Sequence, residues 1–246
     1  MSIEVFNRYE QKYMIPKNLY EDVLKKLDGY MVLDEHNKEK SYTISNIYFD
    51  TDDDYLIRES LEKPKYKEKL RLRSYGVYNM DSKVFLEIKK KYNGLVNKRR
   101  TTLKLGEAYS FTSTGKKPAL KPYMNPQVLN EIEYFLKIYD LSPKLYLAYD
   151  RVAFFGKEDG NLRISFDEKI RSRRTDLRLE HGDYGDPVIN DDMLIMEIKT
   201  PTAQPLWLTH MLSEMEIRKV SFSKYGTEYK NYICGMANEK VYKMAM

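Results

Sequence analysis

Charged and apolar side chains alternate along six short segments of this chain. Successive side chains of a β-strand point to opposite faces, so residues two apart share a face. The segment 67–73 (KEKLRLR) therefore predicts a strand with one cationic face and one face that contains Leu70 and Leu72. The same alternation recurs in five further segments, 8–12, 85–91, 149–151, 163–167 and 195–199. The pattern is typical of antiparallel strands whose two faces meet different surroundings.

Two interpretations of the charged faces stay open. In an ordinary antiparallel sandwich or barrel, the charged faces point into water. Here like charges recur two residues apart, and almost every charged face combines Arg or Lys with one carboxylate, whereas a solvated face would also contain Thr, Gln and Asn. This composition favours a surface that binds a polyanion. If helices pack against the apolar faces, the charged faces line the lumen of a barrel, which becomes a basic tunnel with a few acids.

The remaining pattern predicts more strands than helices. Alternation and β-branched or aromatic residues indicate strands over residues 6–15, 42–50, 66–75, 83–91, 95–103, 145–155, 162–167 and 193–200. Helices are expected over residues 16–27, 125–140, 202–216 and 227–246, and surface loops over residues 106–123 and 181–192. We therefore expect an α+β fold, an antiparallel β-barrel with flanking helices, in a single domain that spans residues 1–246.

Composition excludes several classes of protein. The chain has 246 residues and a formal net charge of +5, so the distribution of charge matters more than its sum. One cysteine, Cys234, excludes an intramolecular disulfide and a cysteine zinc site. The sequence contains no P-loop, no dinucleotide-binding glycine motif and no nucleophilic-serine elbow. No apolar run approaches the roughly 18 residues that a membrane span needs, and the N-terminus has no apolar signal-peptide core. We therefore expect a cytoplasmic protein.

Carboxylates within the basic rows suggest metal binding. Rows of Arg and Lys bind phosphate through charge-assisted hydrogen bonds. A carboxylate among them repels phosphate unless it holds a divalent cation that bridges to phosphate oxygens. For Glu10, Glu87 and Asp167, a metal-ligand role and an ion pair with a neighbouring Arg or Lys remain equal alternatives. We favour Glu197 as a ligand, because its immediate neighbours are apolar.

A segment near the C-terminus offers small hydroxyls beside a lysine and a glycine. In KVSFSKYG, Ser221, Ser223 and Lys224 precede Gly226. Such residues suit a phosphate contact, although an ordinary polar loop has the same composition.

Nine motifs in a fixed order resemble one protein family. They are RYEQKY (8–13), SNIYFDT (45–51), EKLRLRSYG (68–76), FLEIKKK (85–91), NKRR (97–100), YDR (149–151), LRISFDEKI (162–170), MEIKT (196–200) and SFSKYGTEY (221–229). Together they resemble the catalytic domain of the vacuolar transporter chaperone (VTC) complex, a polyphosphate polymerase module. That module belongs to the triphosphate tunnel metalloenzymes, also called CYTH-like proteins.

The resemblance implies a triphosphate tunnel and an ATP-dependent polymerase. In such a polymerase the γ-phosphate of ATP is transferred to a growing polyphosphate chain, with Mn²⁺ or Mg²⁺ as cofactor. The phosphate ligands implied are Lys12, Arg71, Arg73, Lys89, Arg151, Arg163, Lys199 and Lys224. Further substrate contacts fall on Tyr149, Ser223 and either Lys98 or Arg100, and the metal-binding glutamate falls on Glu197. A family lysine is replaced by Ser221, and Lys219 is the residue expected to substitute for it.

The opening motif favours the polymerase branch of this superfamily. Other tunnel enzymes begin with ExExK, whereas this chain has RxExK because Arg8 replaces the first acid. The expected partners are ATP and polyphosphate. Coupling of synthesis to translocation would require a membrane protein encoded as another chain, which would place this protein at the inner face of a membrane.

Three other functions remain as alternatives. The same tunnel with water as acceptor would hydrolyse tripolyphosphate or a nucleoside triphosphate. A non-catalytic module that binds polyphosphate would need the cations alone. Nucleic-acid binding is disfavoured, since carboxylates lie within the basic rows and the net charge is modest.

Overall fold

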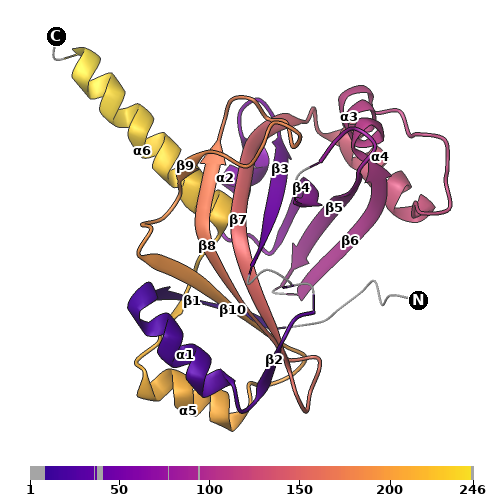
Figure 1. The fold of residues 1–246 in the computed structure, drawn as a ribbon. Helices are drawn as coiled ribbons and strands as arrows, with labels where there is room; N and C mark the ends of the chain where they lie inside the picture. The colour runs from indigo at the N-terminus through magenta and orange to yellow at the C-terminus, as the bar shows by residue number, and fades with distance from the viewer. Residues whose placement is uncertain (1–8, 36, 38–40, 77, 94, 245–246) are drawn as a thin grey trace.

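A strongly curved sheet of eleven strands forms the centre of the protein (Figure 1). The computed structural model describes residues 9–35, 37, 41–76, 78–93 and 95–244. The paired strands are antiparallel, and the strand order is β11-β1-β10-β8-β7-β3-β4-β5-β6, with β2 paired to β7 and β9 paired to β8. The strands are β1 (Tyr9–Pro16), β2 (Met31–Leu33), β3 (Tyr42–Asp50), β4 (Tyr66–Tyr75), β5 (Lys83–Tyr92), β6 (Leu95–Lys104), β7 (Ser142–Gly156), β8 (Arg163–Arg173), β9 (Asp186–Pro187), β10 (Met193–Thr200) and β11 (Lys219–Val220).

The sheet is open, which corrects the prediction of a closed barrel. Strands β11 and β6 end the strand order, and no pairing joins them within the described ranges. The sheet nevertheless curls back on itself. Five strands separate β1 from β5 in the order, yet Glu10 Oε2 of β1 lies 3.9 Å from Lys89 Nζ of β5. The curvature therefore creates a concave face on which distant strands meet.

Two pairs of helices cover the convex face of the sheet, whereas the concave face carries the charged side chains and a third apolar cluster, in which Ile44 and Leu147 meet Ile57 and Tyr225. One apolar cluster joins α3 (Leu105–Thr114) and α4 (Pro126–Ile138) to β4, β5 and β6. A second joins α1 (Tyr20–Leu27) and α5 (Leu206–Glu214) to β1, β8 and β10. Figure 1 shows these two helix pairs at opposite ends of the molecule.

The predicted alternation of strand faces is confirmed. Leu70, Leu72, Leu86 and Ile88 are at most 1% exposed and belong to the apolar cluster beneath α3 and α4. Residues between them in the sequence therefore point to the concave face, because side chains alternate along a strand. The charged faces form a shared internal surface, as the polyanion interpretation requires.

Helix α6 (Lys224–Met244) begins at the concave face and projects away from the sheet (Figure 1). Its first turn is anchored by Tyr225, which is 3% exposed and donates a hydrogen bond to Asp50 at 3.1 Å. The same carboxylate accepts from the backbone of Leu56 and Ile57 and so fixes the start of α2 (Tyr55–Leu61). Among the described residues, none of the helices combines the length and apolarity needed to cross a membrane.

The sequence failed to predict two of the helices. Residues 106–123 were expected to form a loop, but most of α3 lies in this range and ends at Gly115, whose φ of 67° is left-handed. Its buried residues Leu105, Ala108 and Phe111 lie on one face, and the first of them precedes the segment that resembled a loop. Helix α2 was not predicted, because it has only seven residues and shows little apolar periodicity. It also follows directly on a run of acidic residues.

Candidate phosphate-binding site

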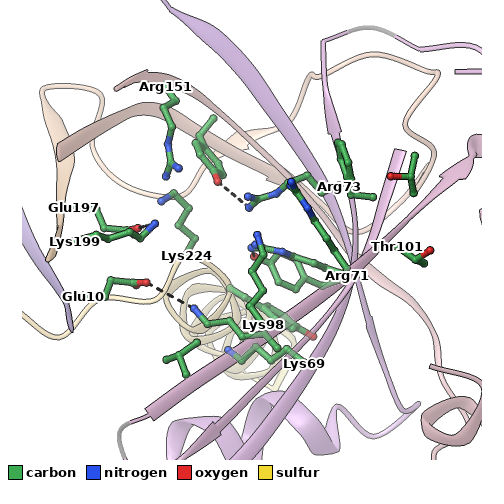
Figure 2. Close-up of a pocket in the computed structure, with 18 of the residues that line it drawn as sticks. Glu10, Lys69, Arg71, Arg73, Lys98, Thr101, Arg151, Glu197, Lys199 and Lys224 are labelled. Atoms are coloured by element: carbon green, nitrogen blue, oxygen red, sulfur yellow. Dashed lines mark hydrogen bonds and ion pairs between the residues drawn. The ribbon is translucent and has the colours of Figure 1, made fainter. Parts of the chain in front are cut away.

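A cavity of about 1110 Å³ occupies the concave face of the sheet. Strands from both halves of the sheet line it, together with the first turn of α6. Its lining contains two carboxylates, Glu10 and Glu197, and eleven cationic side chains, Lys12, Lys69, Arg71, Arg73, Lys89, Lys98, Arg100, Arg151, Arg163, Lys199 and Lys224. Figure 2 shows Arg71, Arg73, Lys98, Arg151 and Lys224 directed toward a common space. This excess of positive charge is complementary to a polyanion.

Glu87 anchors the cations that come from β4 and β6. Its side chain is 1% exposed, and its carboxylate lies 2.7 Å from Arg71 Nε and 2.8 Å from Lys98 Nζ. Burial raises the pKa of Glu87, but the surrounding cations, led by Arg71 and Arg73, outweigh it and hold that pKa well below its usual range. Glu87 is therefore a permanent anion that orients phosphate-binding groups from below the cavity.

Arg73 is held by neutral partners. Its Nε donates to Asn46 Oδ1 at 2.9 Å, and its Nη2 donates to the Tyr149 hydroxyl at 3.1 Å. The Tyr149 ring also lies below two further cations, 4.3 Å from Lys224 Nζ and 5.2 Å from the Arg151 guanidinium. Its nearest carboxylate, that of Glu87, lies 3.9 Å from Nε, so the neutral partners leave much of the charge of Arg73 available to an anion.

Asp167 has the same anchoring role on the other half of the sheet. It is fully buried, and its two oxygens accept from Arg151 Nε and Nη2 at 2.6 and 2.7 Å. Lys224 donates a further hydrogen bond to it. Burial raises the pKa of Asp167, but Arg151 and Lys224 outweigh burial and hold this pKa below its usual value. The carboxylate is therefore ionised at neutral pH.

Glu10 and Glu197 form a different arrangement, in which they share one lysine. Lys12 Nζ lies 3.2 Å from Glu10 Oε1 and 3.7 Å from Glu197 Oε2, and Lys199 Nζ lies 2.5 Å from Glu197 Oε1. Burial and the neighbouring Glu197 raise the pKa of Glu10, but Lys89, Lys12 and Lys199 together lower it to about 2. Two ionised carboxylates thus face the cavity side by side.

This pair fits a small divalent cation. Mg²⁺ is usually held in proteins by one or two carboxylates together with phosphate oxygens. The described residues contain no cluster of three or more His, Cys, Asp or Glu at metal-binding spacing, so a cation at this site would need oxygens from the substrate. Glu10 and Glu197 are the carboxylates that line the cavity, whereas Glu87 and Asp167 lie beneath it.

Nearly all of the expected site residues lie at the cavity. The predicted phosphate ligands line it, as do Tyr149 and Ser223, and Lys98 and Arg100 both reach it from β6. Lys219 is exposed on β11 and is not a lining residue. Arg8 of the RxExK motif lies outside the described residues.

Lys69 lines the cavity, as the alternation along 67–73 predicts, although the family resemblance gives it no role. Other residues of the site were not predicted from the sequence. Tyr48 and Tyr225 also line the cavity, with ring centroids 4.9 Å apart. They join β3 to α6, and only the three-dimensional fold brings these two segments together.

Two lysines of the cavity have pKa values near neutral pH. Burial, together with Lys67 and Lys89, lowers the pKa of Lys69 to about 7. Burial, together with Arg71 and Arg73, also lowers the pKa of Lys98 to about 7, although the neighbouring Glu87 raises it. An incoming polyanion would favour the charged form of both, so its binding would be accompanied by proton uptake.

Two solved structures share the overall fold of this chain. A putative adenylate cyclase from Bacillus halodurans matches with a TM-score of 0.55 and 18% identity, over 90% of this chain and 96% of that one. A putative adenylyl cyclase from Hippeastrum, described as having a dominant triphosphatase activity, matches with a TM-score of 0.54 and 16% identity, over 92% and 96%. At such identities the likeness shows the fold alone.

The family follows from the sequence comparison. Residues 7–233 match the VTC domain, and the chain belongs to that family. Vacuolar transporter chaperone complex subunit 4 of Trypanosoma brucei brucei is 28% identical over 217 residues, which cover 74% of this chain and 27% of that protein. The subunit 4 protein of Schizosaccharomyces pombe is 27% identical over 89% of this chain and 36% of that protein. The chain thus spans about a quarter to a third of the length of these relatives.

Proposed function

We propose that the protein is a polyphosphate polymerase that transfers the γ-phosphate of ATP to a growing polyphosphate chain within the basic cavity. The observation that carries the proposal is the convergence of eleven cationic side chains and two ionised carboxylates on one cavity. Membership of the VTC domain family supports the same activity.

The proposed transfer needs alignment and charge compensation from the protein. The terminal oxygen of the polyphosphate chain forms a bond to the γ-phosphorus, the bond from that phosphorus to the β-γ bridging oxygen breaks, and ADP leaves with the electron pair. Negative charge spreads over the transferred group and the leaving oxygen during this step. Arg71, Arg73 and Arg151 are held by fixed partners. They would therefore bind these oxygens with little reorganisation.

A divalent cation, Mn²⁺ or Mg²⁺, would be held by Glu197 and Glu10. When bound, such an ion would neutralise the negative charge that develops on the phosphate oxygens. Lys12 lies between the two carboxylates, and with these held by the ion its charge would be available to phosphate.

The ionisation of the site favours a phosphate acceptor over water. A polyphosphate end already carries anionic oxygens and needs no general base. Water must lose a proton, which calls for a base with a pKa near the working pH. Glu10, with a pKa of about 2, is a poor base. Lys69 and Lys98 have pKa values of about 7, but a bound polyanion would favour their charged forms and so remove them as bases.

The decisive experiment follows the label of γ-labelled ATP in the presence of Mn²⁺. Long labelled chains are expected. Labelled free phosphate alone would indicate hydrolysis of ATP, and tripolyphosphate binding without turnover would indicate a binding module. Arg71→Ala should lower chain synthesis, whereas Arg218→Ala, which changes an exposed arginine that does not line the cavity, serves as the matched control.

We also propose that the chain works with a membrane protein encoded separately, which would place it at the inner face of a membrane. The relatives are named as subunits of a complex, which supports a partner. Cross-linking in native cells followed by membrane fractionation tests this proposal. Recovery of the protein solely in the soluble fraction, without cross-links to a membrane protein, would contradict it.

A further inference from the structure

A second cavity, of about 1000 Å³, adjoins the phosphate-binding cavity. The two share Phe85, Arg100 and Arg163 as lining residues, so they meet at this border. The second cavity continues past the ends of β3 and β4, where Tyr42, Tyr75 and Gly76 line it. A ligand that is longer than a phosphate chain can therefore extend from one cavity into the other.

The walls of the two cavities differ in chemistry. Rings line the second cavity, with Tyr42 and Tyr75 at a centroid distance of 6.1 Å and Tyr75 and Phe85 at 5.8 Å. Tyr75 is 39% exposed, so part of its ring is available to a ligand. Lysine is absent from the described residues that line this cavity. It is thus suited to a flat, uncharged group and not to a polyphosphate chain.

The shared border is cationic. The Arg100 guanidinium lies 4.6 Å from the centroid of the Phe85 ring, and the Arg163 guanidinium lies 5.0 Å from that of Phe155. Both arginines line both cavities. Beyond the border, Thr43 and Asp183 line the second cavity. The Thr43 hydroxyl donates to Asp150 and Asp183 Oδ2 accepts from Arg171, so the remaining acceptor capacity of both groups can serve sugar hydroxyls or an exocyclic amine.

We propose that the second cavity binds the nucleoside of the nucleotide donor, so that its triphosphate passes Arg100 and Arg163 into the phosphate-binding cavity. This inference rests on the proposed function. It also assigns a direction to the site. Along β4 the side chains on the concave face run from Tyr75 through Arg73 and Arg71 to Lys69. The nucleotide therefore enters at the Tyr75 end, and the polyphosphate chain lies toward Lys69.

Calorimetric titration of Tyr75→Ala with ATP and with tripolyphosphate tests the proposal. The affinity for ATP should fall by about 5-fold to 100-fold, the usual effect of losing one base-stacking ring. The affinity for tripolyphosphate, which has no base, should stay within about twofold of wild type, because Tyr75 does not line the phosphate-binding cavity. Tyr75→Phe keeps the ring and should keep the ATP affinity.

Tyr66→Ala is the matched control. Tyr66 is on the same strand with a similar exposed fraction, 47%, but lies at the opposite end and on the opposite face. Tyr66→Ala should keep the ATP affinity that Tyr75→Ala loses. The two variants should bind tripolyphosphate with equal affinity. An equal loss of both ligands in Tyr75→Ala, or no loss of ATP, would overturn the nucleoside assignment. If wild type bound neither ligand, the proposed function itself would fail.

Photo-crosslinking with 8-azido-ATP gives an independent measurement on the wild-type protein. The modified peptides should contain Tyr42, Tyr75 or Phe85. Labelling confined to peptides around Lys69 and Lys89 would reverse the assigned direction, even if the affinities of the variants followed the expectation above.

Discussion

The four carboxylates of the charged strands fall into two pairs with different partners. Glu87 and Asp167 each accept from an arginine at 2.6–2.7 Å, and both lie beneath the cavity. Glu10 and Glu197 line the cavity, and their ion pairs are with lysines at 2.5–3.9 Å. A planar guanidinium holds a carboxylate in fixed geometry, whereas an ammonium is a point charge that exchanges partners readily. The first pair therefore positions arginines, and the second pair is open to a metal ion.

The largest effect is expected from breaking the anchoring pair. Asp167→Asn removes the anion that compensates buried Arg151 and Lys224. Leaving such charges unpaired typically costs about 3–5 kcal/mol in the free energy of unfolding. Urea denaturation of the full chain should show this loss as a lower midpoint with an unchanged slope.

Asp52→Asn is the control for this measurement. Asp52 also pairs with a lysine, Lys144, but its side chain is 95% exposed, so its replacement should leave the midpoint near that of wild type. If Asp167→Asn unfolded at the wild-type midpoint, the division of the carboxylates into anchoring and exchangeable pairs would be wrong.

The sequence predicted the faces of the strands better than the shape of the sheet. Alternation alone identified Arg71 and Lys89 as partners on one surface, because the two-residue period is local. Closure depends on whether β6 and β11 pair, and nothing local to either strand records that. The role of each acid was equally hidden. Glu87 faces Arg71 across β4 and β5, so only the register of the strands shows that it anchors an arginine.

The next effect concerns the exchangeable pair and turnover. Glu197→Gln keeps the shape of the side chain but removes one anionic ligand from the proposed metal site. Chain synthesis at limiting Mn²⁺ should fall on the order of 100-fold. Metal-free affinity for polyphosphate should stay the same or rise, because a repulsive charge has gone. Parallel measurements of turnover and of calorimetric affinity separate the two effects.

Two variants control the Glu197 experiment. Lys199→Ala should weaken affinity and turnover together, since it removes a phosphate-binding cation, and Glu158→Gln, which changes an exposed residue, should alter neither. Near-normal synthesis by Glu197→Gln at low metal would contradict the role of Glu197 and would leave Glu10 as the remaining proposed ligand.

A smaller effect is expected from one of the anchored arginines. Arg71→Ala leaves Glu87 paired with Lys98 and close to Arg73, so the fold keeps its compensation. One charge-assisted phosphate contact is worth about 1.5–3 kcal/mol, so tripolyphosphate affinity should fall about tenfold or more. Calorimetry at low salt measures this loss. Added salt should weaken binding by the wild-type protein, and a salt-independent affinity would argue against a converging set of cations.

The smallest effect separates the lysines of the cavity from its acids by pH. Between pH 6 and 8 the acids do not titrate, since the pKa of Glu10 is about 2 and those of Glu87 and Glu197 are well below their usual range. Lys69 does titrate, because its pKa is about 7. It is mostly charged at pH 6 and mostly neutral at pH 8, so a bound polyanion must draw in a proton at the higher pH.

Tripolyphosphate affinity should therefore fall as the pH rises from 6 to 8, by at most about tenfold for each such lysine. Titration of the ligand itself affects wild type and variant equally, so the ratio of the two dissociation constants isolates the lysine. In Lys69→Gln the pH dependence should be shallower than in wild type. The unliganded protein should behave in the opposite way. The pKa of Lys69 is lower in the folded chain than the ordinary value of 10.5, so its contribution to the free energy of unfolding rises with pH from about 7 upward. Equal pH dependence of affinity in wild type and Lys69→Gln would show that this lysine stays charged throughout, and the contrast between titrating lysines and fixed acids would then rest on Lys98 alone.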